Sequence, residues 1–438
     1  MKIVIIGASF SGVHCALKAK ELHPYDEIIL VEQEDEVGYL PSGLTLLLNG
    51  KLSSLEEAKF TSNEKLIKQG IHLMTGVKVT DFDFSNKSVT TTQGELLYDR
   101  LVLAMGSSQY SQKFMSEYPG LLTYKKKADA KNALEKIEGS QEVAIIGAGQ
   151  AGMELASALV KSGRKVILIE SMDYPLYKSF DKELLAPLVQ HLEDHELVET
   201  AFSQTVKKVI YHESKQGVNL MTQQGEIHCG VALLASNVRP NLSIFKQHLA
   251  YHTDQTLKVD AYFETSQPGV FAIGDLIQVP SLLLNQTIYL PLINNAVRSG
   301  NVCAENLKKK QTKYMGSIRI IGTHIFGYYL AGCGLTEADS FLYEEEVASL
   351  TLRVPVTIVE NEMVTIKFIY NKKTEVLLGV QIISKANILE KINTYALAID
   401  LKMTIRELAQ KDYFYHPSYT NSIVGQSYLS LRGINNEL

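Results

Sequence analysis

Two glycine-rich stretches have the residue types and spacing that bind a pyrophosphate. They are GASFSG, residues 7–12, and GAGQAG, residues 147–152. The first glycine allows a tight turn out of a strand, the second lets the backbone approach the phosphates, and the third lets a helix pack on that strand. The start of that helix then attracts the phosphates through its free N–H groups and its dipole. The predicted phosphate-binding residues are Gly7, Ser9 and Gly12 in one unit and Gly147, Gly149 and Gly152 in the other.

An acidic residue stands at the matching place in both units. KIVIIG and EVAIIG have the apolar, β-branched pattern of strands buried on both faces, and a helix-like stretch follows each glycine run. The next strands, EIILVE and KVILIE, end at Glu32 and Glu170. An acid in this position accepts hydrogen bonds from ribose hydroxyls. Ser9 replaces the second glycine of the first unit, but it is small enough for the same close approach.

Further elements repeat between the two units. Residues 92–107 are similar to residues 222–237, since each predicts a hairpin that returns to a buried strand and a turn. A third buried strand, in GVFAIGDL, ends at Gly274 and Asp275, and a helix-like stretch follows from about Pro291. The sequence therefore predicts an α/β protein with two Rossmann-like dinucleotide-binding domains. Two nucleotide sites in one chain suggest electron transfer between two bound dinucleotides.

The combination of these motifs resembles the FAD-dependent pyridine nucleotide-disulfide oxidoreductases. The likeness is greatest to the branch with NADH peroxidase, NADH oxidase and coenzyme A-disulfide reductase, and it covers essentially the whole chain. The stretch from LLGVQ to FYHPSY is similar to the α+β dimerisation domain of that branch. The resemblance implies a NAD domain inserted into an FAD domain. The implied boundaries are 1–110 and 240–317 for FAD, 111–239 for NAD(P)H and 318–438 for the dimer interface.

The resemblance also implies how FAD and NADH are bound. The first glycine unit and Glu32 would hold FAD, with Asp275 on its ribityl chain, and the second unit and Glu170 would hold NADH. The helix that starts near Pro291 and Leu292 would point its N-terminus at the flavin, where its dipole stabilises negative charge. The turn with Ala104 and Gly106 is similar to the family motif that closes the first FAD segment. Asn237 stands where the family usually has glycine, and asparagine tolerates a positive φ.

Three positions depart from the peroxidase and oxidase pattern. Ser42 stands where that branch carries a redox cysteine, Phe10 where the peroxidases carry a histidine, and Asn301 where the branch often has an arginine. A serine hydroxyl has no counterpart to the oxidation states of sulfur. Loss of a thiol, an imidazole and a cation from one pocket therefore predicts a different reaction. Ser42 is also a possible cap for the helix GLTLLL, whereas a nucleophilic role would need a neighbouring base.

Other side chains have less specific signals. Cys15 and Cys303 are predicted to be packed core thiols, although Cys303 lies on the flavin-facing helix. Gln150 replaces a tyrosine that often covers the flavin in this branch. His416, in FYHPSY, is either the acid–base that disulfide reductases supply from the partner subunit or a surface histidine. The tyrosines near it, which either line the same pocket or pack in the dimer, are Tyr413, Tyr415 and Tyr419.

Composition excludes several classes of protein. The chain has 438 residues, with 43 Lys and Arg against 48 Asp and Glu, and its net charge of −5 gives no electrostatic case for nucleic acid. Short lysine runs, such as 125–127, are predicted to be solvated ends of helices or strands. No stretch approaches the roughly 18 apolar residues of a membrane span. The four cysteines lie too far apart in sequence for a CxxC or zinc motif, so we expect a reduced, cytoplasmic protein without a metal.

These observations together predict a homodimeric flavoprotein that oxidises NADH through FAD. Without a thiol, its electrons would pass directly to a diffusing acceptor: dioxygen, a quinone or a small redox protein. Two alternatives remain open from the sequence. One is reduction of a disulfide or of coenzyme A disulfide by another cysteine, and the other is a nucleotide-bound redox sensor without turnover.

Overall fold

The computed structural model describes residues 1–109, 120–212, 217–236, 238–245, 248–357, 359 and 361–419. The chain divides by its contacts into two compact units. The first unit consists of Met1–Gly139, Ser236–Pro280 and Gln286–Ser317. The second unit consists of Ser140–Ala235, Ser281–Asn285 and Ile318–Leu438. The three ligand-binding and interface domains, with the boundaries given above, remain a prediction.

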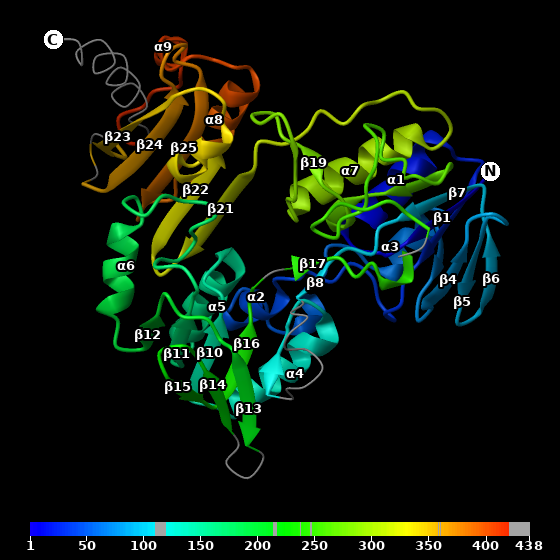
Figure 1. The fold of residues 1–438 in the computed structure, drawn as a ribbon, viewed down its shortest axis with the longest axis horizontal. Coiled ribbons are helices and arrows are strands. Elements are labelled where there is room, and N and C mark those ends of the chain that lie inside the picture. The colour runs from blue at the N-terminus through cyan, green and yellow to red at the C-terminus, as the bar shows by residue number, and fades with distance from the viewer. Residues whose placement is uncertain are drawn as a thin grey trace. The chain divides into compact units, whose positions relative to one another are not determined.

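A parallel five-stranded sheet forms the centre of the first unit. Its order is β18 (Val270–Ala272), β7 (Arg100–Leu103), β1 (Lys2–Ile6), β2 (Glu27–Val31) and β3 (His72–Met74). The apolar runs predicted as buried strands are β1 and β2, which are almost completely buried. Helices α1 (Phe10–Leu22) and α7 (Ile293–Asn306) lie side by side (Figure 1). They approach so closely that a Cβ on Gly300 would lie 2.5 Å from the carbonyl oxygen of Ser11.

The second unit repeats this design, as the sequence predicts. Its parallel strands run in the order β12 (Val198–Ala201), β11 (Lys165–Ile169), β10 (Glu142–Ile146) and β16 (Val231–Leu234), which matches β3, β2, β1 and β7. Each unit also carries an antiparallel three-stranded sheet, directly before β7 in the first unit and before β16 in the second. These sheets are β4 (Val79–Asp83), β5 (Ser88–Thr91) and β6 (Gly94–Leu97), and β13 (Lys208–His212), β14 (Gly217–Met221) and β15 (Glu226–Cys229).

An antiparallel sheet forms the C-terminal part of the second unit (Figure 1). Its order is β21 (Ile320–Ile325), β22 (Tyr328–Gly334), β25 (Leu377–Ser384), β24 (Met363–Asn371) and β23 (Val347–Pro355). Helix α8 (Lys391–Asp400) packs on β22 and β25, and α9 (Ile405–Ala409) follows it. The predicted fold class is therefore confirmed: parallel α/β sheets with a separate α+β C-terminal part. No helix within the described ranges has the length and apolar character needed to cross a membrane.

The remaining elements are short or connect these sheets. The helices are α2 (Gly43–Leu48), α3 (Asn63–Lys68), α4 (Lys127–Glu138), α5 (Gln150–Lys161) and α6 (Ala186–Glu193). The strands are β8 (Ser108–Gln109), β9 (Leu121–Leu122), β17 (Val238–Arg239), β19 (Val279–Pro280) and β20 (Thr287–Ile288).

A buried lysine joins two sequence-distant parts of the second unit. The side chain of Lys367, on β24, is only 1% exposed, and its ammonium lies 2.9 Å from a carboxylate oxygen of Asp181. Glu183 and Glu337 bind the same ammonium. Asp181 also accepts hydrogen bonds from the backbone N–H groups of Glu337 and Ala338. The three acids lie close enough to hold a metal ion, but the ammonium already supplies a positive charge among them.

Candidate functional site

The first glycine loop adopts a backbone that only small residues permit. Gly7 has φ +102°, and a Cβ there would lie 2.4 Å from the carbonyl oxygen of Ala104. A Cβ on Gly12 would lie 1.8 Å from the Gly7 carbonyl oxygen, so the third glycine is needed for the helix to leave the turn. Ser9 precedes α1 with φ −95° and ψ −163°, an extended conformation open to serine. The replacement of the second glycine therefore strains nothing.

The second loop repeats this geometry with more open space. Gly147 has φ +108°, and a Cβ on Gly152 would lie 1.9 Å from the Gly147 carbonyl oxygen. Gly149, which precedes α5, has nothing within 4 Å of where its Cβ would be. Neither α1 nor α5 has a side-chain cap, so the first N–H groups of both helices are left for a ligand. Both loops thus fit a dinucleotide pyrophosphate.

The two predicted ribose acids take equivalent positions. Glu32 accepts a hydrogen bond from the backbone N–H of Ala8 at 2.7 Å. Glu170 accepts from the N–H of Ala148 at 2.9 Å and from the N–H of Met172 at 3.1 Å. Each carboxylate is thereby held beside its glycine loop. A carboxylate has about four acceptor sites, so these bonds leave capacity for ribose hydroxyls.

Asp275, which follows β18, forms a polar cluster with Ser107 and Lys125. Its carboxylate accepts a hydrogen bond from the hydroxyl of Ser107, the residue after Gly106, and lies 3.3 Å from the ammonium of Lys125. Lys125 also donates to the Ser107 hydroxyl at 2.7 Å. Gly274 has φ +67°, and a Cβ on it would collide with the Ser11 side chain. The structure therefore places Gly274 and Asp275 next to the turn that follows β7.

Ser107 and Lys125 were missed as site candidates in the sequence. The prediction that the lysine run 125–127 is solvated was wrong for Lys125, which binds Asp275. It was also wrong for Lys127, whose side chain is 22% exposed and pairs with Glu36. Nothing in three consecutive lysines indicates that Lys125 and Lys127 pair with different carboxylates. Only the fold brings Lys125 to a residue 150 positions further along the chain.

Helix α7 starts close to the predicted place. Pro291 and Leu292 precede it, and Leu292 provides no side-chain cap. The N–H of Asn295 donates to the Asn294 side chain at 2.8 Å, which leaves the N–H groups of Ile293 and Asn294 for a ligand. Asn301 lies on this helix and is half-buried. Cys303, two residues later, is fully buried against Cys15 of α1. The predicted packing of both thiols in the core is therefore confirmed.

All four cysteines are free thiols and buried. Burial raises the pKa of Cys303 well above its usual range, and the neighbouring Cys15 raises it further. Burial likewise raises the pKa of Cys229 and of Cys333 to about 12. Because the thiolate is the reactive form, these thiols are poor nucleophiles near neutral pH.

The loop that carries Ser42 is tied to the first glycine loop. The N–H of Gly38 donates to the Ala8 carbonyl at 3.4 Å, and the N–H of Phe60 donates to the Gly38 carbonyl at 3.0 Å. The ring of Phe10, the first residue of α1, stacks on the ring of Phe60 with centroids 4.1 Å apart. Phe10 therefore contacts Phe60, a residue that is hydrogen-bonded to Gly38 in the loop leading to Ser42. That Phe10, Ser42 and Asn301 share one pocket stays a prediction. Phe60 was not recognised in the sequence.

Ser42 has a free hydroxyl at the start of α2. Its carbonyl accepts the first helical hydrogen bond, from the N–H of Leu46, but its side chain does not cap the helix. The prediction that the Ser42 side chain could cap the helix was therefore wrong. Ser42 is exposed, and its hydroxyl has no hydrogen-bond partner among the described residues. No base activates it there as a nucleophile.

The side chain of Tyr39 packs against the start of α2 at Gly43. Its hydroxyl is buried and has no hydrogen-bond partner among the described residues. A Cβ on Gly43 would lie 2.6 Å from that hydroxyl, so the residue after Ser42 must be glycine for α2 to start here. Burial raises the pKa of Tyr39 to about 12, which keeps the phenol protonated.

Gln150 is fixed at the start of α5. Its amide donates to the Glu154 carboxylate at 3.0 Å and to the Gly322 carbonyl on β21 at 3.2 Å. The Thr323 hydroxyl also donates to Glu154 at 2.7 Å. These bonds anchor the predicted NAD(P)H helix to the antiparallel sheet of the same unit.

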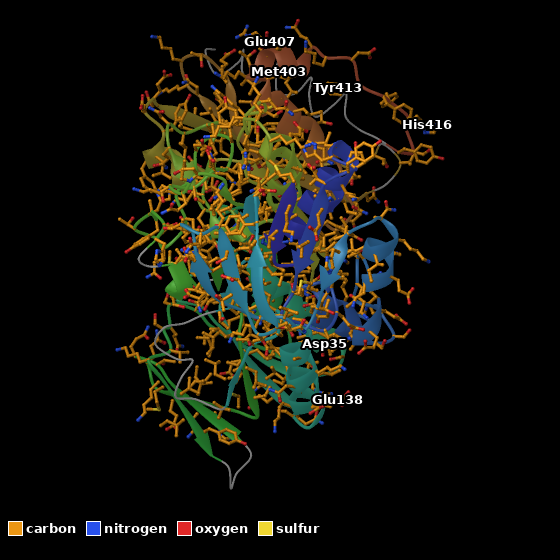
Figure 2. The ribbon with its side chains drawn as sticks, turned by 90° about the vertical axis from the view of Figure 1, so that its right-hand side faces the viewer. Asp35, Glu138, Met403, Glu407, Tyr413 and His416 are labelled. Carbon is orange, nitrogen blue, oxygen red and sulfur yellow. The ribbon has the colours of Figure 1, made fainter. Side chains whose placement is uncertain are left out.

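His416 lies on the exposed segment after α9. Figure 2 shows it at the outer edge of the side chains, beyond Tyr413. Its ring stacks on Tyr419 at 4.5 Å, and its Nδ1 accepts the Ser418 N–H at 3.2 Å. Tyr415 is also exposed, whereas Tyr413 donates to the Leu408 carbonyl. The described contacts of His416 are thus with its own segment, and a role as acid–base in a partner subunit stays a prediction. Asn237 lies outside the described residues.

Known proteins show the same organisation. The family model described as pyridine nucleotide-disulphide oxidoreductase matches residues 1–300, and the model of the dimerisation domain of these proteins matches residues 320–426. An NADH oxidase of Enterococcus faecalis is 28% identical over 436 residues, which are 96% of this chain and 96% of that protein.

Two solved structures extend the comparison. A pyridine nucleotide-disulfide family oxidoreductase from Enterococcus faecalis V583 is 38% identical, with a TM-score of 0.88 over 99% of this chain and 100% of that chain. A water-forming NADH oxidase from Lactobacillus brevis, bound to NADH, has a TM-score of 0.92 and 26% identity, with coverage of 99% and 100%. This chain therefore belongs to the pyridine nucleotide-disulphide oxidoreductase family and is an FAD-dependent NAD(P)H oxidoreductase similar to NADH oxidases.

Proposed function

We propose that the protein oxidises NADH and passes the electrons directly from its flavin to a diffusing acceptor, without a redox-active cysteine. One observation carries the proposal: residue 42 is an exposed serine whose hydroxyl has no partner in the described part of the chain, in a loop tied to the first glycine loop. The burial of all four thiols supports it, since no cysteine is available in that loop. When bound, FAD supplies the two-electron carrier between the nicotinamide and the acceptor.

The residues proposed to hold FAD belong to the first unit. The first glycine loop receives the pyrophosphate, Glu32 the adenosine ribose and Asp275 the ribityl chain. Ser107 and Lys125 orient the Asp275 carboxylate, and Lys125 offsets its negative charge beside an anionic cofactor. The start of α7, after Pro291 and Leu292, directs its N–H groups and dipole at the flavin ring.

The residues proposed to hold the nicotinamide cofactor belong to the second unit. The loop from Gly147 to Gly152 receives its pyrophosphate, and Glu170 binds its ribose. Glu170 favours NADH, because its carboxylate would repel the 2′-phosphate of NADPH. The C-terminal sheet and α8 provide the interface of a homodimer, which agrees with the match to a dimerisation domain.

The residue types at positions 42 and 10 favour direct electron transfer to an acceptor over reduction of peroxide. Neither Ser42 nor Phe10 can form a sulfenic acid or transfer a proton as an imidazole does. Dioxygen reduced at such a site yields hydrogen peroxide. Disulfide reduction is disfavoured, since it needs an accessible thiolate: all four cysteines are buried, and burial raises the pKa of Cys229, Cys303 and Cys333.

Steady-state assays with a panel of acceptors test the proposal. NADH consumption should depend on an acceptor, and aerobic turnover should produce one hydrogen peroxide per NADH. A redox sensor without turnover would consume no NADH with any acceptor. Thiol release from coenzyme A disulfide, measured beside these assays, would instead support the disulfide reductase.

A further inference from the structure

The hairpin of β21 and β22 is hydrogen-bonded to one side of α5. The Thr323 hydroxyl donates to the Glu154 carboxylate at 2.7 Å, and the N–H of Phe326 donates to the Ser157 hydroxyl at 2.9 Å. Gln150, Glu154 and Ser157 follow one another at intervals of four and three residues, so they lie on the same face of the helix. The first two turns of α5 are therefore held by a hairpin that belongs to the C-terminal sheet.

The side chains at the start of α5 are joined through the Glu154 carboxylate. Its Oε1 atom accepts from the Thr323 hydroxyl and from the Gln150 amide, the latter at 3.0 Å. The Gln150 amide nitrogen also donates to the Gly322 carbonyl at 3.2 Å, which uses both of its N–H bonds. Thr323 is buried, and a hydrogen bond to a charged group is among the stronger ones in proteins. The protein alone thus fixes the orientation of Gln150 and Glu154.

The hairpin is itself fixed to α6 and to the rest of the C-terminal sheet. The Tyr328 hydroxyl donates to the Pro187 carbonyl on α6 at 3.3 Å, and the Tyr328 ring lies edge-on to His191 with centroids 5.9 Å apart. Strand β22 pairs with the central strand β25 from Tyr329 to Gly334. Because β21 pairs with β22 along its whole length, the position of Thr323 depends on this sheet.

We propose that Thr323 is a positioning residue for NADH, which holds the start of α5 in the place where it binds the cofactor pyrophosphate. The inference rests on the proposed function, which assigns this pyrophosphate to the loop from Gly147 to Gly152. Among the described residues, no side chain caps the start of α5, so its N–H groups are left for a ligand. A site that is ordered in advance binds without the entropy cost of ordering it. Thr323 acts through Glu154 and not on the cofactor itself.

The expected kinetic effect of Thr323 follows from the chemistry of NADH. In this molecule a ribose separates the pyrophosphate from the nicotinamide ring that gives up the hydride. Loss of the Thr323 contact should therefore weaken binding equally in the ground state and in the transition state. Such a change raises KM and leaves kcat unchanged.

The dissociation constant of NAD⁺ from the oxidised holoenzyme, measured by isothermal titration calorimetry, tests the inference without turnover. Thr323→Val should weaken NAD⁺ binding about tenfold, which corresponds to about 1.4 kcal/mol. Thr323→Ser should retain the affinity, because serine keeps the hydroxyl. The matched control is Thr256→Val in the first unit, since the buried Thr256 hydroxyl also donates to a carboxylate, that of Asp254, at 2.7 Å. Unchanged affinity in Thr323→Val, or an equal loss in Thr256→Val, would overturn the inference.

Steady-state kinetics provide a second measurement on the same variants. Thr323→Val should raise KM for NADH about tenfold at unchanged kcat, and its FAD content should equal that of the unmodified protein. A lower kcat at unchanged KM would contradict a positioning role. If Thr323→Val fails to fold, Ser157→Ala decides, since it removes the acceptor for the N–H of Phe326. Weaker NAD⁺ binding by Ser157→Ala would then support the inference, and unchanged binding would overturn it.

Anaerobic reduction separates this inference from the proposed function. NADH without an acceptor should reduce the FAD of the unmodified protein. If NADH does not reduce it, the proposed function fails. If NADH reduces it and Thr323→Val binds NAD⁺ as tightly as the unmodified protein, only the role of Thr323 fails.

Discussion

The ammonium of Lys125 lies 3.3 Å from a carboxylate oxygen of Asp275, which follows β18. The contact joins segments 150 residues apart in the chain, and Ser107 bridges the pair. A carboxylate beside a diphosphate needs a compensating cation, because like charges in a partly buried site repel one another. Lys125 meets this need in the proposed FAD site.

We therefore expect Lys125→Met to weaken FAD binding about tenfold, and Asp275→Ala to weaken it further by removing the ribityl contact. The measurement is a fluorescence titration of deflavinated protein with FAD. Lys126→Met is the matched control, since this neighbouring lysine pairs with Glu34 and is more exposed. Equal FAD affinity in the Lys125 and Lys126 variants would refute a role for the Lys125–Asp275 pair.

The preference for NADH should depend on Glu170. Its carboxylate is held by the N–H groups of Ala148 and Met172, and no arginine occurs in residues 171–179 to bind a 2′-phosphate. The unmodified protein should show kcat/KM for NADH at least tenfold above that for NADPH, or about 1.4 kcal/mol. Glu170→Gln should narrow this ratio by removing the charge. A ratio near one in the unmodified protein would show that the carboxylate does not discriminate.

Short sequence patterns predicted the fold because the elements of each dinucleotide-binding unit are close together in the sequence. The strand, glycine turn, helix and acid of each unit occur within about 30 residues, so hydrophobic periodicity and turn chemistry identify them. Lys125 could not be assigned in this way, since its partner lies at the end of another strand far along the chain. Phe60 was missed for the same reason: its stacking on Phe10 depends on backbone bonds between two loops. Long-range side-chain pairing leaves no signal in a single sequence.

Removal of the Asp181 carboxylate should destabilise the second unit. Asp181→Asn removes the buried carboxylate 2.9 Å from the Lys367 ammonium, while Glu183 and Glu337 stay in place, and we expect a loss of about 1–3 kcal/mol in the free energy of unfolding. Urea denaturation followed by circular dichroism measures it. Lys372→Met is a suitable surface control, because its pair with Glu346 is exposed and solvent-screened and should contribute little to stability. Similar losses in both variants would contradict the importance of the buried pair.

The contribution of Asp181 should depend on pH in one direction. Burial raises the pKa of this carboxyl, but Lys367, two backbone N–H groups and the Gln381 amide lower it more, so its pKa is held below the usual value. A group with a lowered folded pKa stabilises the protein above its unfolded pKa, about 3.9, and loses this effect as the pH falls through the folded value. The difference between the unmodified protein and Asp181→Asn should therefore shrink below about pH 4. A difference that grows on acidification would be inconsistent with the lowered pKa.

The native thiols should react slowly with alkylating reagents. For Cys229 and Cys333, with pKa values of about 12, only about one thiol in ten thousand is ionised at pH 8. Iodoacetamide followed by mass spectrometry should label the cysteines slowly in the native protein and completely in denaturant. Cys303→Ser should retain NADH oxidation. Rapid native labelling of Cys303, with loss of activity, would show that this thiol had been recruited.

An anaerobic titration with NADH tests the absence of a second redox centre most directly. A cysteine at the Ser42 position, which the resemblance implies for the peroxidase and oxidase branch, would store electrons on sulfur beside the flavin, whereas we propose that the flavin is the only reservoir here. We expect one equivalent of NADH to bleach the FAD completely, with no long-wavelength band from a thiolate next to the oxidised flavin. A requirement for two equivalents, or the appearance of that band before bleaching, would contradict the account.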